Sequence, residues 1–150
     1  MDSQTMTAMP PAIRILPMST VEFADCGVEE IQKNFFLNEL PDREGGRFLH
    51  YKYGLKTPCG SVILFQYRNA IVASALFLDA ERFGVPDKDG YEGTLNFDVK
   101  SIRVFDPVSS AAVCGIWQEF KRFSHVKQSL NPQSYSLFQQ GLTNIRAPMT

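Results

Sequence analysis

Cysteine and histidine are scarce in this sequence, and their scarcity excludes two kinds of protein. The three cysteines, Cys26, Cys59 and Cys114, are far apart and odd in number, so they form neither a disulfide framework nor a C-x-x-C motif. The two histidines, His50 and His125, have no second metal ligand three or four residues further on. We therefore expect a reducing compartment, no structural metal site and no cofactor.

Excess charge and long apolar runs are also lacking. The formal net charge is -1 over 150 residues, so the chain is not basic throughout, and any nucleic acid must be held by a local patch or by one recognised base. No run approaches the roughly 20 apolar residues of a membrane helix, and the N-terminus does not resemble a signal peptide. We expect a cytoplasmic protein that does not enter a membrane.

Catalytic signatures are missing as well. The sequence has no G-x-S-x-G, no G-x-x-x-x-G-K-[ST], no H-E-x-x-H and no H-N-H pattern. Its acidic residues are scattered, mostly in segments rich in Gly and Pro, where Asp is commonly structural. An enzyme is therefore not the first expectation, and no catalytic residue is assigned.

What the sequence does contain is the composition of one folded domain. Hydrophobic residues make up 44% and charged residues 21%, which is the ordinary globular range. We expect a flexible tail over residues 1–12 and one domain over residues 13–145.

Two unbroken apolar runs lie near the middle of the chain, in "CGSVILFQYRNAIVASALFLD". Runs without alternation are typical of strands covered on both faces. We expect adjacent antiparallel strands at 61–67 and 70–78, with Phe65 and Ile71 buried, and a third strand at 94–105 in the same sheet. The parity of the apolar residues changes near Lys100-Ser101, which predicts a β-bulge there.

Helix signals surround these strands. Apolar spacing predicts a helix over 28–40 that is stopped by Pro41, after a possible first helix capped by Ser19. A short helix is expected after Pro107, and another between an Asn131 cap and Gly141. A short strand is expected before Asn131. The expected order is αα-β-β-β-α-β-α, a mixed α/β (α+β) fold in which a small antiparallel or mixed β-barrel has helices packed outside.

Three stretches resemble EVE and YTH domains of the PUA-like superfamily. "GSVILFQYRNAIVASALFLD" is similar to their central strand pair, "DGYEGTLNFDVKSIRVFDPV" to the segment in which an aromatic and a Gly precede a long strand, and "FSHVKQSLNPQSYSLFQ" to the EVE ending. The arrangement also resembles recognition modules that precede HNH nuclease domains in modification-dependent restriction enzymes. The resemblance covers roughly residues 45 to 140 and implies a PUA-like (EVE-type) barrel whose mouth receives a modified base.

Such a site needs flat rings for stacking and polar groups for the base edge. YTH domains use tryptophans, but the single Trp117 is expected in the core, so the resemblance points to other aromatics. Each residue also has a structural interpretation: the aromatics could pack on the core or share one strand face, and the polar groups could bind backbone. The base-binding candidates are Tyr91, Phe83, Tyr51, Tyr53, Gln66 and Ser74.

Two basic stretches could hold phosphates, because cations set affinity without reading sequence. The alternative is an ordinary solvated surface. The first stretch contributes Arg47, Lys52, Lys56 and Arg68, and the second, "KRFSHVK", contributes Lys121, Arg122, His125 and Lys127.

The resemblance implies a nucleic-acid-binding module that takes a flipped, modified base of DNA, working with a nuclease domain or subunit that is absent from this sequence. Three alternatives stay open. They are an RNA-binding module of the same fold, a small enzyme acting on a nucleotide-like substrate, and a protein that binds only a partner protein. The oligomeric state, and the base that is recognised, do not follow from the sequence.

Overall fold

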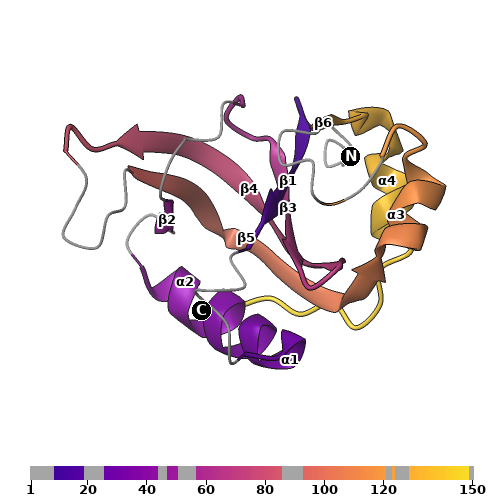
Figure 1. Cartoon of the computed structure of the whole chain (residues 1–150), viewed down its shortest axis with the longest axis horizontal. Coiled ribbons are helices and arrows are strands. Elements are labelled where there is room, and N and C mark those ends of the chain that lie inside the picture. The colour runs from indigo at the N-terminus through magenta and orange to yellow at the C-terminus, as the bar shows by residue number, and fades with distance from the viewer. Residues whose placement is uncertain are drawn as a thin grey trace, which may run out of the picture.

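Three antiparallel strands form the centre of the structure, as the apolar runs predict. β3 spans Val62–Tyr67, β4 Ala70–Arg82 and β5 Gly93–Ser109. β3 pairs with β4, and β4 pairs with β5 (Figure 1). Phe65 and Ile71 are fully buried, so this part of the prediction is confirmed. The computed structural model describes, with the backbone alone for 47–50, residues 9–18, 26–43, 47–50, 57–85, 93–120, 123 and 129–148.

Three short strands complete a six-stranded sheet in the order β2-β5-β4-β3-β1-β6. β1 (Ile13–Pro17) runs parallel to β3, β2 (Arg47–His50) is antiparallel to β5, and β6 (Ser129–Leu130) is antiparallel to β1. β1 and β2 were not expected, so the predicted order αα-β-β-β-α-β-α lacks a strand before the described helical segment and another after it. The helix predicted to begin at Ser19 lies outside the described residues.

The fold is therefore mixed α+β. Among the described residues no pairing joins the edge strands β2 and β6, so the sheet is open there and the expected barrel closure is not found. None of the described helices is long and apolar enough to cross a membrane.

Irregular pairing bends the two long strands. Ser74 pairs with Arg103 and Leu76 with Asp98, so β5 carries extra residues between these two pairs. Leu76 N–H donates instead to the hydroxyl of Ser101, at 2.7 Å. The bulge predicted at this place is confirmed, and it restores the alternation of buried side chains along β5.

The turn between β3 and β4 is as tight as a hairpin allows. Arg68 and Asn69 have φ values of 52° and 76°. Positive φ at both central residues is the pattern that matches the twist of antiparallel strands. The apolar runs on either side are thereby paired directly.

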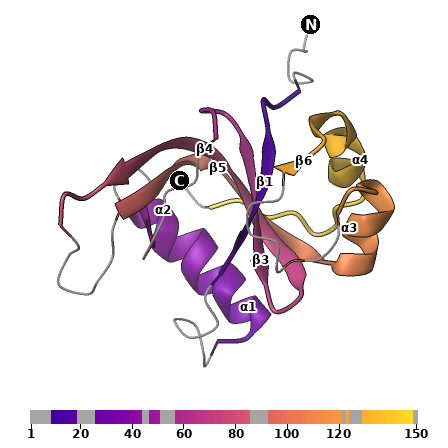
Figure 2. The same ribbon diagram turned by 45° about the horizontal axis from the view of Figure 1, so that its top comes forward.

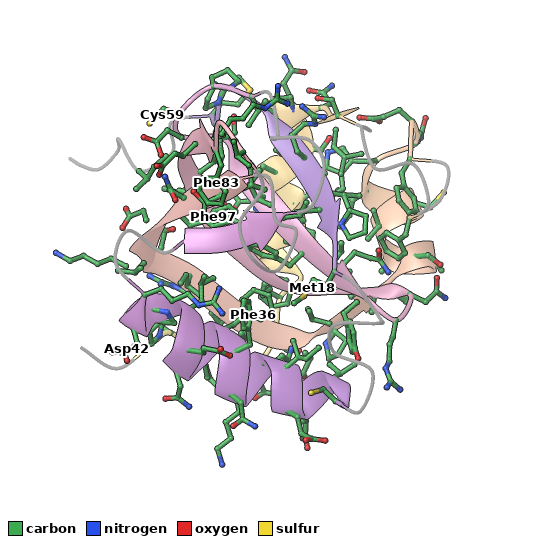
Figure 3. The ribbon with its side chains drawn as sticks, turned by 60° about the vertical axis from the view of Figure 1, so that its left-hand side comes forward. Met18, Phe36, Asp42, Cys59, Phe83 and Phe97 are labelled. Carbon is green, nitrogen blue, oxygen red and sulfur yellow. The ribbon has the colours of Figure 1, made fainter. Side chains whose placement is uncertain are left out.

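One helical segment covers the first face of the sheet. α1 (Val28–Glu30), the π-helix η2 (Ile31–Glu39) and α2 (Leu40–Asp42) follow one another without a break, which confirms the helix predicted over 28–40 and ends it one residue past Pro41. Figure 3 shows Phe36 and Met18 between this segment and the sheet. The buried residues of the segment are Ile31, Gln32, Phe35, Phe36 and Leu40.

A second helical layer lies on the other side of the sheet (Figure 2). It consists of α3 (Ser110–Ile116), the 3-10 turn η4 (Pro132–Ser134) and α4 (Tyr135–Gln140). A second hydrophobic cluster, separate from the one beneath η2, joins these helices to Ile13 and Leu64 of the sheet. Because each face has its own cluster, the central strands are apolar on both faces.

The caps of this layer follow the sequence signals. The Ser109 side chain accepts from Ala112 N–H at 3.3 Å, and that of Asn131 accepts from Gln133 N–H at 2.9 Å. Trp117 is fully buried, as expected, and its indole N–H donates to the Asn131 carbonyl at 2.8 Å. The core indole thus fixes the start of the last helical segment.

Gln32 is the polar centre of the first face. Its side chain is 2% exposed, and its amide N–H groups donate to the carbonyls of Val72 at 2.9 Å and Phe105 at 2.6 Å. Both carbonyls lie where the pairing of β4 with β5 is irregular between Ile71 and Ala73. The Gln32 amide therefore gives these two carbonyls the hydrogen-bond donor that the neighbouring strand does not provide at the irregularity.

Residues 142–148, the C-terminal strap, add a bridge to the outer edge of β5. Val104 and Arg146 exchange two backbone hydrogen bonds, of 2.9 and 2.8 Å. The Asp106 carboxylate accepts from the Thr143 hydroxyl at 2.7 Å and the Asn144 amide at 2.8 Å. Strap and strand are thus joined by backbone and side-chain bonds together.

Acidification is expected to release the strap. The hydroxyl of Thr143 and the amide of Asn144, together with the charge of Arg146, hold the pKa of Asp106 below its ordinary value of about 3.9. Because the pKa of Asp106 is lower in the folded protein, its ionised carboxylate stabilises the attachment of the strap fully at pH values above the ordinary pKa. This stabilisation is lost as the pH falls through the lowered pKa. Amide exchange at Arg146, corrected for intrinsic rate, should accelerate in that range. In Asp106→Asn this acceleration should vanish, and an unchanged pH dependence would contradict the assignment.

Candidate functional site

The end of β4 and the start of β5 meet at one corner of the sheet, far from α3 and α4 (Figure 1). Arg82 pairs with Gly93 there, at the last residue of one strand and the first of the next. We name this place the distal corner and define it by Asp79, Glu81, Phe83, Thr94 and Asn96.

The polar residues of the distal corner share one face of the sheet. Leu95 and Phe97 belong to the hydrophobic cluster between the sheet and the helical segment that contains η2. Side chains alternate along a strand, so Thr94 and Asn96 lie on the opposite face. Asp79 pairs with Asn96, and cross-strand partners face the same side. The polar groups of the corner therefore lie on the same face of the sheet as α3 and α4, and these helices cover that face away from the corner.

Two of these polar atoms have no hydrogen-bond partner among the described residues. They are the hydroxyl oxygen of Thr94, a residue that is 0% exposed, and the side-chain oxygen of Asn96. The amide nitrogen of Asn96 does have one, because it donates to an Asp79 carboxylate oxygen at 2.6 Å. A buried polar atom without a partner costs roughly 1–3 kcal/mol, so such atoms are rare and often functional.

The charges of the corner decide which part of a nucleic acid could lie there. Asp79 and Glu81 are both exposed. Carboxylates repel phosphates, so these two residues are not phosphate contacts, although a carboxylate and an amide can bind the edge of a base. Phosphates would have to be held by cations elsewhere.

Of the four predicted stacking residues, the structure places Phe83 at this corner. It directly follows the last residue of β4 and is half-buried. Tyr51, Tyr53 and Tyr91 lie outside the described residues. The described strand ends next to them, His50 and Gly93, are paired with each other.

The structure does not bring Gln66 and Arg68 to Phe83. Gln66 lies near the end of β3, where it pairs with Ile71, and Arg68 lies in the turn before β4. The 13 residues of β4, at about 3.3 Å each, separate both from the end of that strand. Arg68 donates to the Cys26 carbonyl at 3.0 Å, and its guanidinium lies 5.3 Å from the centre of the Tyr67 ring. Arg68 is thus exposed and already has protein partners.

Ser74 lies between the two ends. It is 7% exposed and pairs with Leu64 and Arg103 in the middle of the sheet. It is separated from the distal corner by the bulge at Leu76. It therefore belongs to the centre of the sheet and not to the corner.

Of the two predicted phosphate contacts within the described residues, Arg47 comes near the corner and Arg68 does not. The backbone of Arg47 pairs with Asn96 in the register of β2 and β5, and its side chain is outside the description. The other cations of the two basic stretches fall outside the described residues, namely Lys52, Lys56, Lys121, Arg122, His125 and Lys127.

Sequence reasoning missed Thr94 and Asn96. The alternation of Leu95, Phe97 and Val99 was available, and it assigns the residues between them to the other face. The hydrogen bond to Asp79, however, depends on a register that includes an irregularity between Phe77 and Asp79. The sequence does not reveal such a register, so the cluster could not be predicted.

In the described part of the chain, no group of His, Cys, Asp and Glu side chains could hold a metal ion. The chain matches no family model, no curated protein and no solved structure.

Proposed function

We propose that the protein is a nucleic-acid-binding module that takes a modified, flipped base of DNA against the distal corner. The observation that carries the proposal is the pair of buried polar atoms on Thr94 and Asn96 that have no partner among the described residues, at the same corner of the sheet as the half-buried Phe83. Base recognition requires this combination of an aromatic surface and a few fixed polar groups.

The finer fold assignment belongs to this proposal. The six-stranded sheet with helices on both faces is compatible with a PUA-like domain of the EVE type, and the sequence resemblance favours that type over other α+β folds. A cytoplasmic module of this kind would work with a nuclease domain or subunit that cuts modified DNA. Tyr91, Tyr51 and Tyr53 are its further stacking candidates.

A panel of matched DNA duplexes tests the proposal. They carry cytosine, 5-methylcytosine, 5-hydroxymethylcytosine, adenine or N6-methyladenine at one position, with an RNA strand as the competitor. We expect one modified base to bind at least several-fold more tightly than its parent. Affinity should fall roughly tenfold or more across a several-fold rise in salt, since cations hold the phosphates. Equal, salt-independent binding to all members would refute the proposal.

Phe83→Ala is the variant that locates the site. A stacked base is worth about 1–3 kcal/mol per aromatic, so affinity for the preferred base should fall by that amount. Leu137→Ala is the matched control, because Leu137 is 56% exposed on α4, far from the corner. If Phe83→Ala unfolds the protein, Phe83 is a core residue. If it changes neither stability nor affinity, the site lies elsewhere, and Tyr91→Ala is the next test.

A further inference from the structure

We propose that Asp79 and Asn96 make the distal corner selective for a ligand that presents a hydrogen-bond donor, such as the exocyclic amino group of a nucleobase. The inference rests on the proposed function and adds the chemical class of the base. It uses only Asp79, Asn96 and Thr94, which the structure describes.

The orientation of the Asn96 amide carries the argument. An amide has an oxygen that accepts and a nitrogen that donates, whereas an ionised carboxylate only accepts. The nitrogen of Asn96 lies 2.6 Å from an Asp79 carboxylate oxygen. Rotating the amide by half a turn would place two acceptors against each other, so Asp79 fixes the orientation. The group left without a partner among the described residues is therefore an acceptor, the Asn96 oxygen.

A fixed acceptor discriminates among ligands by charge. It binds an N–H or O–H group, and it repels a carbonyl oxygen at the same place because both carry negative partial charge. Adenine and cytosine present an amino group on their pairing edge, where thymine and uracil present a carbonyl. The corner should thus prefer adenine-type or cytosine-type bases, including derivatives that keep an amino hydrogen.

Thr94 supplies the second contact. Its hydroxyl can donate as well as accept, and it lies two residues from Asn96 on the same face of β5. In adenine and cytosine a ring nitrogen that accepts lies next to the amino group. A hydroxyl and a fixed acceptor on one strand face supply the two complementary kinds of hydrogen-bonding group. Since the Thr94 and Asn96 oxygens are buried in the free chain, a local opening of the corner must accompany binding.

Removing the amino group from the ligand tests the inference without introducing a new acceptor. Duplexes with adenine or cytosine at the target position are compared with duplexes carrying purine or pyrimidin-2-one, which lack that group. We expect roughly three- to tenfold weaker binding without it, the range for one hydrogen bond. Equal affinity with and without the amino group overturns the inference and leaves the proposed function intact. If none of these duplexes binds the wild-type protein, the proposed function fails, and the inference falls with it.

Two variants separate recognition from folding. Asp79→Ala frees the Asn96 amide to rotate, so the preference for the amino group should largely disappear while the bases are still bound. Thr94→Val removes a buried hydroxyl that has no partner in the described part of the chain, so the melting temperature should stay unchanged or rise while affinity falls roughly three- to tenfold. A preference that survives Asp79→Ala, or a Thr94→Val protein that melts earlier and binds as before, contradicts the assignment. Leu137→Ala is again the control.

Discussion

Replacing Phe65 by alanine is expected to lower the free energy of unfolding by about 3–5 kcal/mol. Phe65 is 0% exposed, and its ring lies 4.8 Å from that of Phe36 and 5.2 Å from that of Phe97, measured between centroids. It therefore connects the helical segment to both β3 and β5. Truncation removes the ring from all of these contacts and leaves a cavity that surrounding side chains fill only in part. Urea denaturation, with the slope checked for two-state behaviour, measures the loss.

Leu78→Ala is the matched control for Phe65→Ala. Leu78 lies on the neighbouring strand β4 but is 41% exposed, so its truncation should cost less than about 1 kcal/mol. If the two variants lost similar amounts of unfolding free energy, the contacts among the Phe36, Phe65 and Phe97 rings would not be a main source of stability.

Gln32→Leu is expected to cost roughly 2–5 kcal/mol, although leucine is apolar and similar in size. The variant leaves the carbonyls of Val72 and Phe105 buried without their donor, at about 1–3 kcal/mol each. It also removes the oxygen that faces the Arg146 guanidinium at 3.5 Å. Amide exchange at Arg146 should therefore accelerate together with the fall in stability, because the strap loses one of its attachments.

Gln139→Leu provides the comparison, since Gln139 is exposed on α4 and the chemical change is the same. Its effect should lie within about 0.5 kcal/mol of zero. An equally small effect of Gln32→Leu would mean that water or other donors replace the Gln32 amide at the Val72 and Phe105 carbonyls, which would contradict the role given to Gln32.

Sequence patterns predicted the centre of the fold because they act locally. The runs that became β3 and β4 lack alternation, and burial on both faces is the physical reason. The caps at Ser109 and Asn131 satisfy helix N–H groups from side chains only two or three residues away, so they can be recognised without tertiary information.

The strands β1 and β2 could not be predicted in the same way. β1 has five residues and β2 has four, so each offers only a short pattern. Their strand conformation depends on partners that are distant in the chain, since Ile13 pairs with both Val62 and Leu130. Tertiary context therefore decides these segments, and local propensity does not.

The candidate site was predicted in part for a related reason. Phe83 and Arg47 were selected by residue type, and the register places both at or beside the distal corner. Arg68 was selected by the same criterion, but it lies at the other end of β4, in contact with Tyr67. Residue type indicates which groups can bind a base. Only the register of the strands determines which groups lie together.

The parallel pairing of β1 with β3 has a consequence for how the chain folds during synthesis. β1 is made before its partner strand, which begins at Val62, and Phe138, whose ring packs against Trp117 at 5.5 Å, is made later still. Contacts between distant residues are slow to form, because the intervening chain must first be ordered. A ribosome-bound chain that lacks Phe138 therefore exposes one apolar face of β3. Such nascent chains are expected to bind chaperones, whereas the released chain is not.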